Sequence, residues 1–147
     1  MKFNLIIDKT KDEEIVATVH ERSELTDRIE ALILEYNGTD KLAAFNKDEM
    51  LFLSFSEIEC ITVLDGKTYA VDSRGTMLRI KKRLYELEAL LPSYFIRINK
   101  SSLANEKRLK KFTTSFSGAV DAVFKCGYTE YVSRRCFAEI KRRFDSK

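Results

Sequence analysis

Residues 95–105 read FIRINKSSLAN, and this stretch decides how the rest of the sequence is interpreted. Its first half alternates in the way that is typical of a strand, but four polar residues, Asn99, Lys100, Ser101 and Ser102, then follow one another. A buried strand would not place four polar side chains at one point. We therefore interpret this point as a candidate binding surface.

The sequence on both sides predicts hairpins, because short apolar runs alternate with turns that contain glycine. Asp65-Gly66 is a two-residue link with the chemistry of a type I′ turn, and Ser117-Gly118 and Cys126-Gly127 mark later turns. We expect strands over residues 58–64, 67–72, 77–80, 109–116, 119–125 and 128–132. The last two-thirds of the chain is thus predicted to be mainly antiparallel sheet.

Three segments have the period of a helix instead. The first starts after Ser23, carries Leu25, Ile29, Leu32, Ile33 and Tyr36, and stops at Asn37-Gly38. The second runs from Ile80 to Leu91 and is closed by Pro92, and the third begins near Ser133 and reaches Phe144. We interpret the three apolar stripes as core.

Residues 1–46 are predicted to form a separate strand-strand-helix layer, followed by a domain over residues 47–147. Phe3, Leu5 and Ile7 indicate a first strand, and residues 15–20 a second. The segment Thr39–Lys41 is the expected linker. Because so thin a layer cannot bury enough surface alone, it packs either on the rest of the chain or on a second copy.

Charge is divided unevenly along the chain. Residues 1–46 hold 6 basic and 10 acidic side chains, residues 47–91 hold 7 and 8, and residues 92–147 hold 13 and 5. The last third therefore has a net charge of +8 within a chain of only +3. Such a concentration attracts polyanions, although a solvated basic face is the alternative interpretation.

Composition argues against membrane, secreted and catalytic functions. No apolar run is long enough to span a membrane, so we expect a cytoplasmic protein without disulfides. The three cysteines are not spaced for zinc, the single His20 lies in a predicted strand, and no phosphate loop or hydrolase motif is present. We expect neither an enzyme nor a bound metal, cofactor or small-molecule substrate, although a nuclease based on Asp and Glu pairs is left open.

Four linked motifs carry a resemblance that none of them carries alone. In order these are YELEALLP at 85–92, the quoted stretch at 95–105, SFSG at 115–118 and VSRR at 132–135. Over about residues 48–144 the chain resembles the LytTR DNA-binding domain of bacterial transcription regulators. Asn99 stands where the family usually has His, and Ala104 where it has Val. The resemblance implies an α+β fold, mainly antiparallel, that inserts loops into successive major grooves of double-stranded DNA.

The same resemblance implies where DNA is contacted. Lys100 and Arg135 are suited to guanine recognition, and Ser133 and Arg134 to a phosphate at a helix start. Arg97 is either a phosphate contact or a structural ion pair. The full set of candidate DNA-binding residues is Lys67, Thr68, Arg97, Asn99, Lys100, Ser101, Ser102, Ser133, Arg134 and Arg135. Residues Lys107, Arg108, Lys110 and Lys111 are expected to attract the DNA backbone without reading bases.

The implied function is that of a sequence-specific transcription regulator. The 47 residues before the resemblance are too few for a phosphorylation receiver domain, so control is expected from abundance, from the N-terminal layer or from a separate inhibitor protein. A homodimer formed through the N-terminal layer and a helix that merely packs on its own domain stay equal alternatives. The rival function is a protein-interaction module that keeps the fold without binding DNA.

Overall fold

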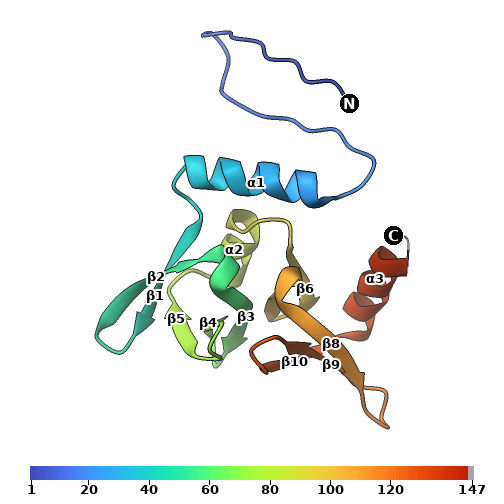
Figure 1. Ribbon diagram of the computed structural model, residues 1–147. Coiled ribbons are helices and arrows are strands. Elements are labelled where there is room, and N and C mark those ends of the chain that lie inside the picture. The colour runs from blue at the N-terminus through green and yellow to red at the C-terminus, as the bar shows by residue number, and fades with distance from the viewer. Residues whose placement is uncertain (146–147) are drawn as a thin grey trace.

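Two antiparallel sheets form the body of the molecule in the computed structural model, which describes residues 1–145 (Figure 1). The larger sheet has the strand order β2-β1-β5-β4-β3-β7-β6, and the smaller has the order β10-β9-β8. The larger sheet contains β1 (Lys41–Asn46), β2 (Glu49–Ser54), β3 (Ile58–Leu64), β4 (Lys67–Asp72), β5 (Met77–Ile80), β6 (Phe95–Asn99) and β7 (Ser102–Asn105). The smaller contains β8 (Leu109–Thr114), β9 (Val120–Phe124) and β10 (Thr129–Val132). The predicted α+β class, mainly antiparallel, is confirmed.

The glycines lie in turns with positive φ angles, as their positions in the sequence predicted. Asp65 and Gly66 have φ angles of 51° and 74°, which is the pair of positive angles that a type I′ turn requires. Leu64 and Lys67 are paired across it, so the turn also fixes the register of β3 and β4. At the β8–β9 hairpin the Gly118 N–H donates to the Ser115 carbonyl at 3.0 Å, and Gly118 has a φ of 82°.

The hairpin of β1 and β2 was not predicted. Its turn contains Lys47 with a φ of 55°, a conformation that lysine seldom adopts, so the sequence carries no glycine to mark it. Phe45 of β1 pairs with Arg79 of β5, which joins this hairpin to the larger sheet. The expected boundary between residues 46 and 47 therefore falls inside the turn of a hairpin.

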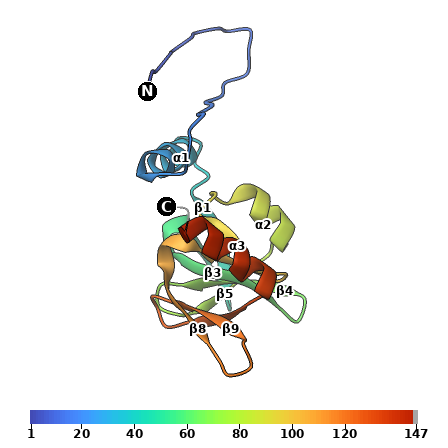
Figure 2. The same ribbon diagram turned by 90° about the vertical axis from the view of Figure 1, so that its right-hand side faces the viewer.

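The two strands predicted in residues 1–20 are wrong: this part of the chain contains no strand. Residues 1–20 extend away from the start of α1 (Glu24–Tyr36), turn back on themselves and lie apart from both sheets (Figures 1 and 2). Phe3 is 86% exposed and Ile7 83% exposed. Alternation of apolar side chains marks a segment that suits a strand, but a strand also needs a partner for its backbone, and this single chain offers none.

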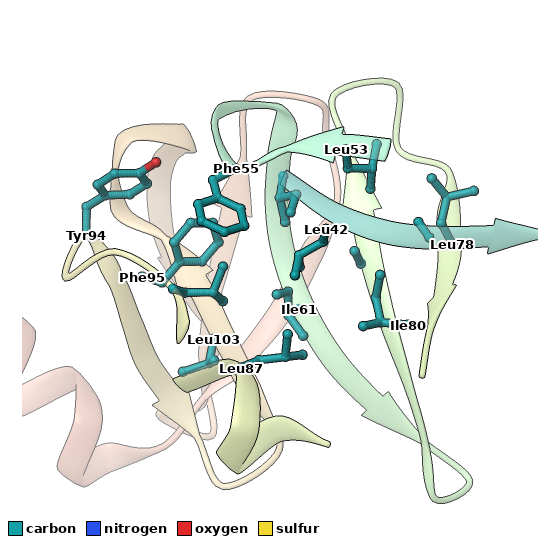
Figure 3. Packing of buried hydrophobic residues seen from close by; sticks show 14 residues of the cluster. Leu42, Leu53, Phe55, Ile61, Leu78, Ile80, Leu87, Tyr94, Phe95 and Leu103 are labelled. Carbon is teal, nitrogen blue, oxygen red and sulfur yellow. The ribbon is translucent and has the colours of Figure 1, made fainter. Parts of the chain in front are cut away.

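Two apolar clusters hold the sheets and helices together. In the first, Leu87 of α2 (Leu84–Leu90) packs with Ile61 and Leu103 of the larger sheet (Figure 3). Helix α2 begins after Ile80, because Ile80 pairs with Thr68 as the last residue of β5. In the second cluster, Cys136 and Ile140 of α3 (Arg134–Asp145) lie among buried residues of both sheets, namely Ile98, Val120, Phe124 and Val132.

Helix α1 begins after Ser23 as predicted, with a capping box in which Ser23 and Thr26 bond each other's backbone. The interpretation of its apolar stripe as core is wrong, because α1 has no buried residue. Leu32 is 64% exposed and Tyr36 82% exposed. No helix within residues 1–145 is both long and apolar enough to cross a membrane.

Candidate nucleic-acid interface

Four chain turns meet at one end of the molecule, which we call the loop edge. It consists of the turn 65–66 with Lys67, the turn 100–101, the turn 115–119 and residues 131–135. The Val63 N–H donates to the Ser101 carbonyl at 3.0 Å, which holds the end of β3 beside the β6–β7 turn. The Ser133 N–H donates to the Ile98 carbonyl at 2.9 Å, which holds the start of α3 beside the same turn.

Asn99 is the residue that fastens these turns to one another. Its Nδ2 donates to the Tyr131 carbonyl at 2.6 Å, and its Oδ1 accepts from the Ser101 N–H at 2.7 Å. One amide side chain thus ties the β6–β7 turn to the end of β10. Since Asn99 is buried, it shapes the loop edge from inside, and the structure does not present it to DNA.

The β8–β9 turn reaches the loop edge through strand pairing. Val120 at the start of β9 pairs with Val132 at the end of β10, so residues 115–119 lie at the same end of the smaller sheet as the start of α3. Phe116 at this turn is fully exposed. In Figure 2 the β8–β9 turn lies at the end of the molecule away from α1. The motif SFSG was noticed in the sequence, but Phe116 was not among the predicted site residues.

Three predicted residues give the loop edge its exposed positive charge: Lys100, Arg134 and Arg135. Within residues 1–145 no ion pair involves any of them. Lys67 at the start of β4 is also exposed and forms no ion pair with residues 1–145. Ser133 accepts from the Cys136 N–H through Oγ at 3.2 Å and so caps α3. The first turn of that helix therefore faces the loop edge with its positive dipole end.

Two other predicted residues are buried beneath the loop edge, Thr68 and Ser102. Ser102 Oγ lies 2.9 Å from Thr62 Oγ1 and donates to Glu130 Oε1 at 2.9 Å. The Tyr128 hydroxyl donates to the same carboxylate oxygen at 3.3 Å. Burial and the charge of Glu130 together raise the pKa of Tyr128, so its hydroxyl stays a donor. Ser102 therefore supports the turn and is not exposed to a ligand.

Arg97 makes two contacts that support the β6–β7 turn. Its guanidinium forms an ion pair with Glu88 of α2, and its Nη1 donates to the Lys100 carbonyl at 2.8 Å. The second bond stabilises the turn that carries Lys100. Of the two interpretations that the sequence left open, the structure shows the ion pair.

The basic residues after β7 divide into paired and unpaired groups. Lys107 lies 3.5 Å from Asp27, and Arg108 is paired with the fully buried Glu59, whose hydrogen bond raises the pKa of the guanidinium. Lys110, Lys111 and Lys125 are exposed, and no ion pair within residues 1–145 involves them. Of the four residues expected to attract the DNA backbone, Lys110 and Lys111 are the two without an ion pair to residues 1–145.

The described part of the chain holds no group of three or more His, Cys, Asp or Glu side chains arranged to bind a metal ion. All three cysteines are free thiols, and burial raises the pKa of Cys60 well above its ordinary value. A buried thiol that stays protonated is a poor nucleophile. What the loop edge offers is a set of cations and hydrogen-bond donors, which is chemistry for binding an anion.

Comparison with known proteins agrees with this surface. The LytTr DNA-binding domain family matches residues 48–145. Two Staphylococcus aureus proteins, from strains MSSA476 and MW2, are 31% identical over 146 residues, which span 97% of this chain and 97% of theirs; both are named uncharacterized HTH-type transcriptional regulators. A solved LytTr DNA-binding domain from Bacillus cereus has the same fold, with a TM-score of 0.64 at 22% identity over 71% of this chain and 96% of that one. The chain is a member of the LytTr DNA-binding domain family.

Proposed function

We propose that the protein is a transcription regulator that binds double-stranded DNA sequence-specifically through the loop edge. The observation that carries the proposal is the convergence of four turns at one end, with Lys67, Lys100, Arg134 and Arg135 exposed and without ion pairs within residues 1–145. Elsewhere Arg97, Lys107 and Arg108 are held in internal ion pairs. The four unpaired cations of the loop edge therefore lie together on a surface that a polyanion can reach.

The reading elements are proposed to be loops that enter successive major grooves. The relatives are named for a helix-turn-helix, but within residues 1–145 strands separate each helix from the next, so no two helices form that motif. Helix α1 docks at the opposite end of the β6–β7 hairpin from Lys100, through the bond of Glu30 with Ser93 and the bond of the preceding Arg22 with Glu106. Helix α3 points its start at the loop edge, and the turns beside it are proposed to contact base edges.

Each exposed residue takes a role that follows from its chemistry. Arg135 carries the planar fork that binds guanine O6 and N7 bidentately. Lys100 donates to guanine or to a phosphate. Arg134, beside the capped start of α3, binds a phosphate, as does Lys67 from the β3–β4 turn. The sequence-independent attraction of Lys110 and Lys111 adds to affinity without adding specificity.

A pair of neighbouring arginines tests this proposal. DNA bound by the protein is selected from a random pool, and affinity for the selected site and for a scrambled site is measured by fluorescence anisotropy at fixed salt. Arg135→Ala is expected to cost about 1 to 3 kcal/mol at the selected site and little at the scrambled site. Arg134→Ala is expected to weaken both in the same ratio.

Lys125→Ala is the control, because Lys125 is equally exposed but lies at the other end of β9 from the loop edge. It should leave both affinities nearly unchanged. Failure of the selection to enrich any sequence, with Arg135→Ala indistinguishable from Lys125→Ala, would contradict the proposal and favour the protein-interaction module.

A further inference from the structure

The N-terminal twenty residues carry many exposed apolar side chains. Apart from Met1, which is 99% exposed, their large apolar side chains are exposed by between 40% at Val19 and 86% at Phe3. They occur in two runs, and between the runs the chain turns: the Thr10 N–H and hydroxyl both donate to Asp8 Oδ1, at 2.9 and 2.6 Å. These side chains are Phe3, Leu5, Ile6, Ile7, Ile15, Val16 and Val19.

Helix α1 continues this surface on one of its two faces. At 100° per residue, Leu25, Leu32 and Tyr36 lie within about 20° of one line along the helix. Asp27, Glu30 and Leu34 lie on the opposite side, and these are the residues that attach α1 to the body. Asp27 pairs with Lys107, Glu30 accepts two hydrogen bonds from Ser93, and Leu34 packs against the first apolar cluster. The apolar line therefore faces away from the protein's own core.

We propose that this apolar N-terminal surface binds a second copy of the same chain. From the sequence, the apolar side chains of the N-terminal layer could be covered either by the rest of the same chain or by a second copy. The structure shows that the rest of the same chain leaves them exposed. The two apolar runs have the alternation of strands, but a two-stranded ribbon is marginally stable alone. Two such ribbons, one from each copy, form a four-stranded sheet. The apolar face of this sheet covers the outward apolar side chains of α1 in both copies.

The amount of surface is that of a stable dimer. Seven side chains of the N-terminal segment and three of α1 are at least 40% exposed. At roughly 100 Å² each they offer on the order of 1,000 Å² per copy, against about 800 Å² per partner in a standard interface. Monomers seldom expose a contiguous apolar patch above a few hundred Å². A second copy presents the same surface, so a closed two-fold arrangement buries both.

The position of this surface leaves the loop edge free. Glu30 of α1 accepts from Ser93, and Arg22, just before α1, bonds Glu106. Both contacts lie at the open end of the β6–β7 hairpin, whereas Lys100 lies at its closed end. Figures 1 and 2 both place α1 and the N-terminal segment on the other side of the sheets from the β8–β9 turn. Association through the N-terminal surface therefore needs no DNA, and its test is independent of DNA binding.

Sedimentation velocity of the full chain without DNA tests the proposal. At micromolar concentration the native protein should sediment with twice the mass of one chain. Leu5→Asp in the segment and Leu32→Asp on α1 should each yield monomers, because a charge is then buried in the interface. Phe116→Asp is the matched control: it places the same charge at an exposed apolar site at the other end and should stay dimeric.

A second readout separates loss of association from loss of fold. Because Leu5 is 75% exposed and Leu32 64% exposed, the thermal unfolding of the body should survive both changes. Hydrogen exchange should show amides 3–7 and 15–20 protected in the native protein and unprotected in the two variants. A native chain that is monomeric throughout the concentration range overturns the proposal, as do Leu5→Asp and Leu32→Asp variants that remain dimers. Protection that arises only after another protein is added overturns it as well.

Discussion

Asn99 connects the two loops that we propose to read DNA, although its own side chain is buried. Replacement by Ala leaves the Tyr131 carbonyl and the Ser101 N–H without their partner. We expect Asn99→Ala to reduce the free energy of unfolding by about 1 to 3 kcal/mol, which is the cost of unsatisfied buried polar groups. Denaturant unfolding measures it.

Asn46→Ala is the matched control, since Asn46 is exposed at the end of β1 and should change stability by less than about 0.5 kcal/mol. If Asn99→Ala were as harmless as the control, the two loops would be held by other contacts. The assignment of Asn99 as the internal fastening of the loop edge would then be wrong.

Lys100 is the exposed residue at the tip of the same turn, and its contact is either a phosphate or a base edge. Lys100→Met keeps most of the aliphatic stem and removes the charge. The logarithm of affinity is measured against the logarithm of salt concentration. A lost phosphate contact reduces the slope by about one unit, whereas a lost base contact leaves the slope nearly intact and lowers affinity at the selected site.

Lys125→Met should change neither the slope nor the affinity, because Lys125 lies away from the loop edge. An unchanged affinity in Lys100→Met would remove Lys100 from the interface altogether.

At the scale of elements, hairpins were predictable where the residue types of the turn favour its backbone conformation. Asp65-Gly66 specifies a positive φ at both positions, so β3, β4 and their register follow from local chemistry. The β1–β2 hairpin turns at Lys47 instead, and this turn contains no glycine that would mark it in the sequence. The predicted N-terminal strands show the reverse error, because a pattern of side chains does not provide a backbone partner.

In the candidate site too, local sequence predicted some features and tertiary packing decided others. The motifs located Lys100 on an exposed turn and Arg135 at the exposed start of α3, as expected of residues that meet a ligand. They did not distinguish these from Thr68 and Ser102, which are polar but buried. A buried hydroxyl is tolerated because Glu130, far away in sequence, accepts its hydrogen bond. That partner is set by tertiary packing, which local patterns do not contain.

The docking of α1 depends on charge and should therefore depend on pH. Burial tends to raise the pKa of Asp27, but its hydrogen bond and ion pair with Arg22, together with Lys107, lower it overall. A carboxylate with a lowered pKa stabilises the folded state above its ordinary value of 3.8 and loses that contribution as the pH falls through the folded value. Stability should thus drop on acidification below about pH 4, and less so in Asp27→Asn.

Thermal unfolding from pH 7 to pH 3 measures this difference. Glu24→Gln is the control on the same helix, because the Glu24–Arg28 pair is exposed on both sides and contributes little. Identical acid dependence in Asp27→Asn and the native protein would show that the carboxylate does not hold α1 in place.

At the scale of the whole molecule, two surfaces lie at opposite ends, with the sheets between them (Figure 1). Removal of residues 1–21 should spare the fold and the affinity for a single DNA half-site, but abolish cooperative binding to two adjacent half-sites. Removal of residues 1–46 should be far more damaging, because it deletes β1 with the buried Leu42 and Ala44. Truncating a buried Leu to Ala alone costs about 2 to 5 kcal/mol.

Gel-shift titrations on DNA with one and with two half-sites compare the truncated proteins. Cooperativity that persists without residues 1–21 would place the contact between copies elsewhere on the chain.

The central claim is that loops of one end of this molecule read the major groove of DNA, and methylation interference tests it most directly. A selected DNA site is methylated at guanine N7, which lies in the major groove, or at adenine N3, which lies in the minor groove. The account predicts that N7 methylation blocks binding at two clusters about one helical turn, roughly 10 base pairs, apart, and that Arg135→Ala removes the interference at one guanine. Interference confined to adenine N3, or none at guanine N7, would contradict it.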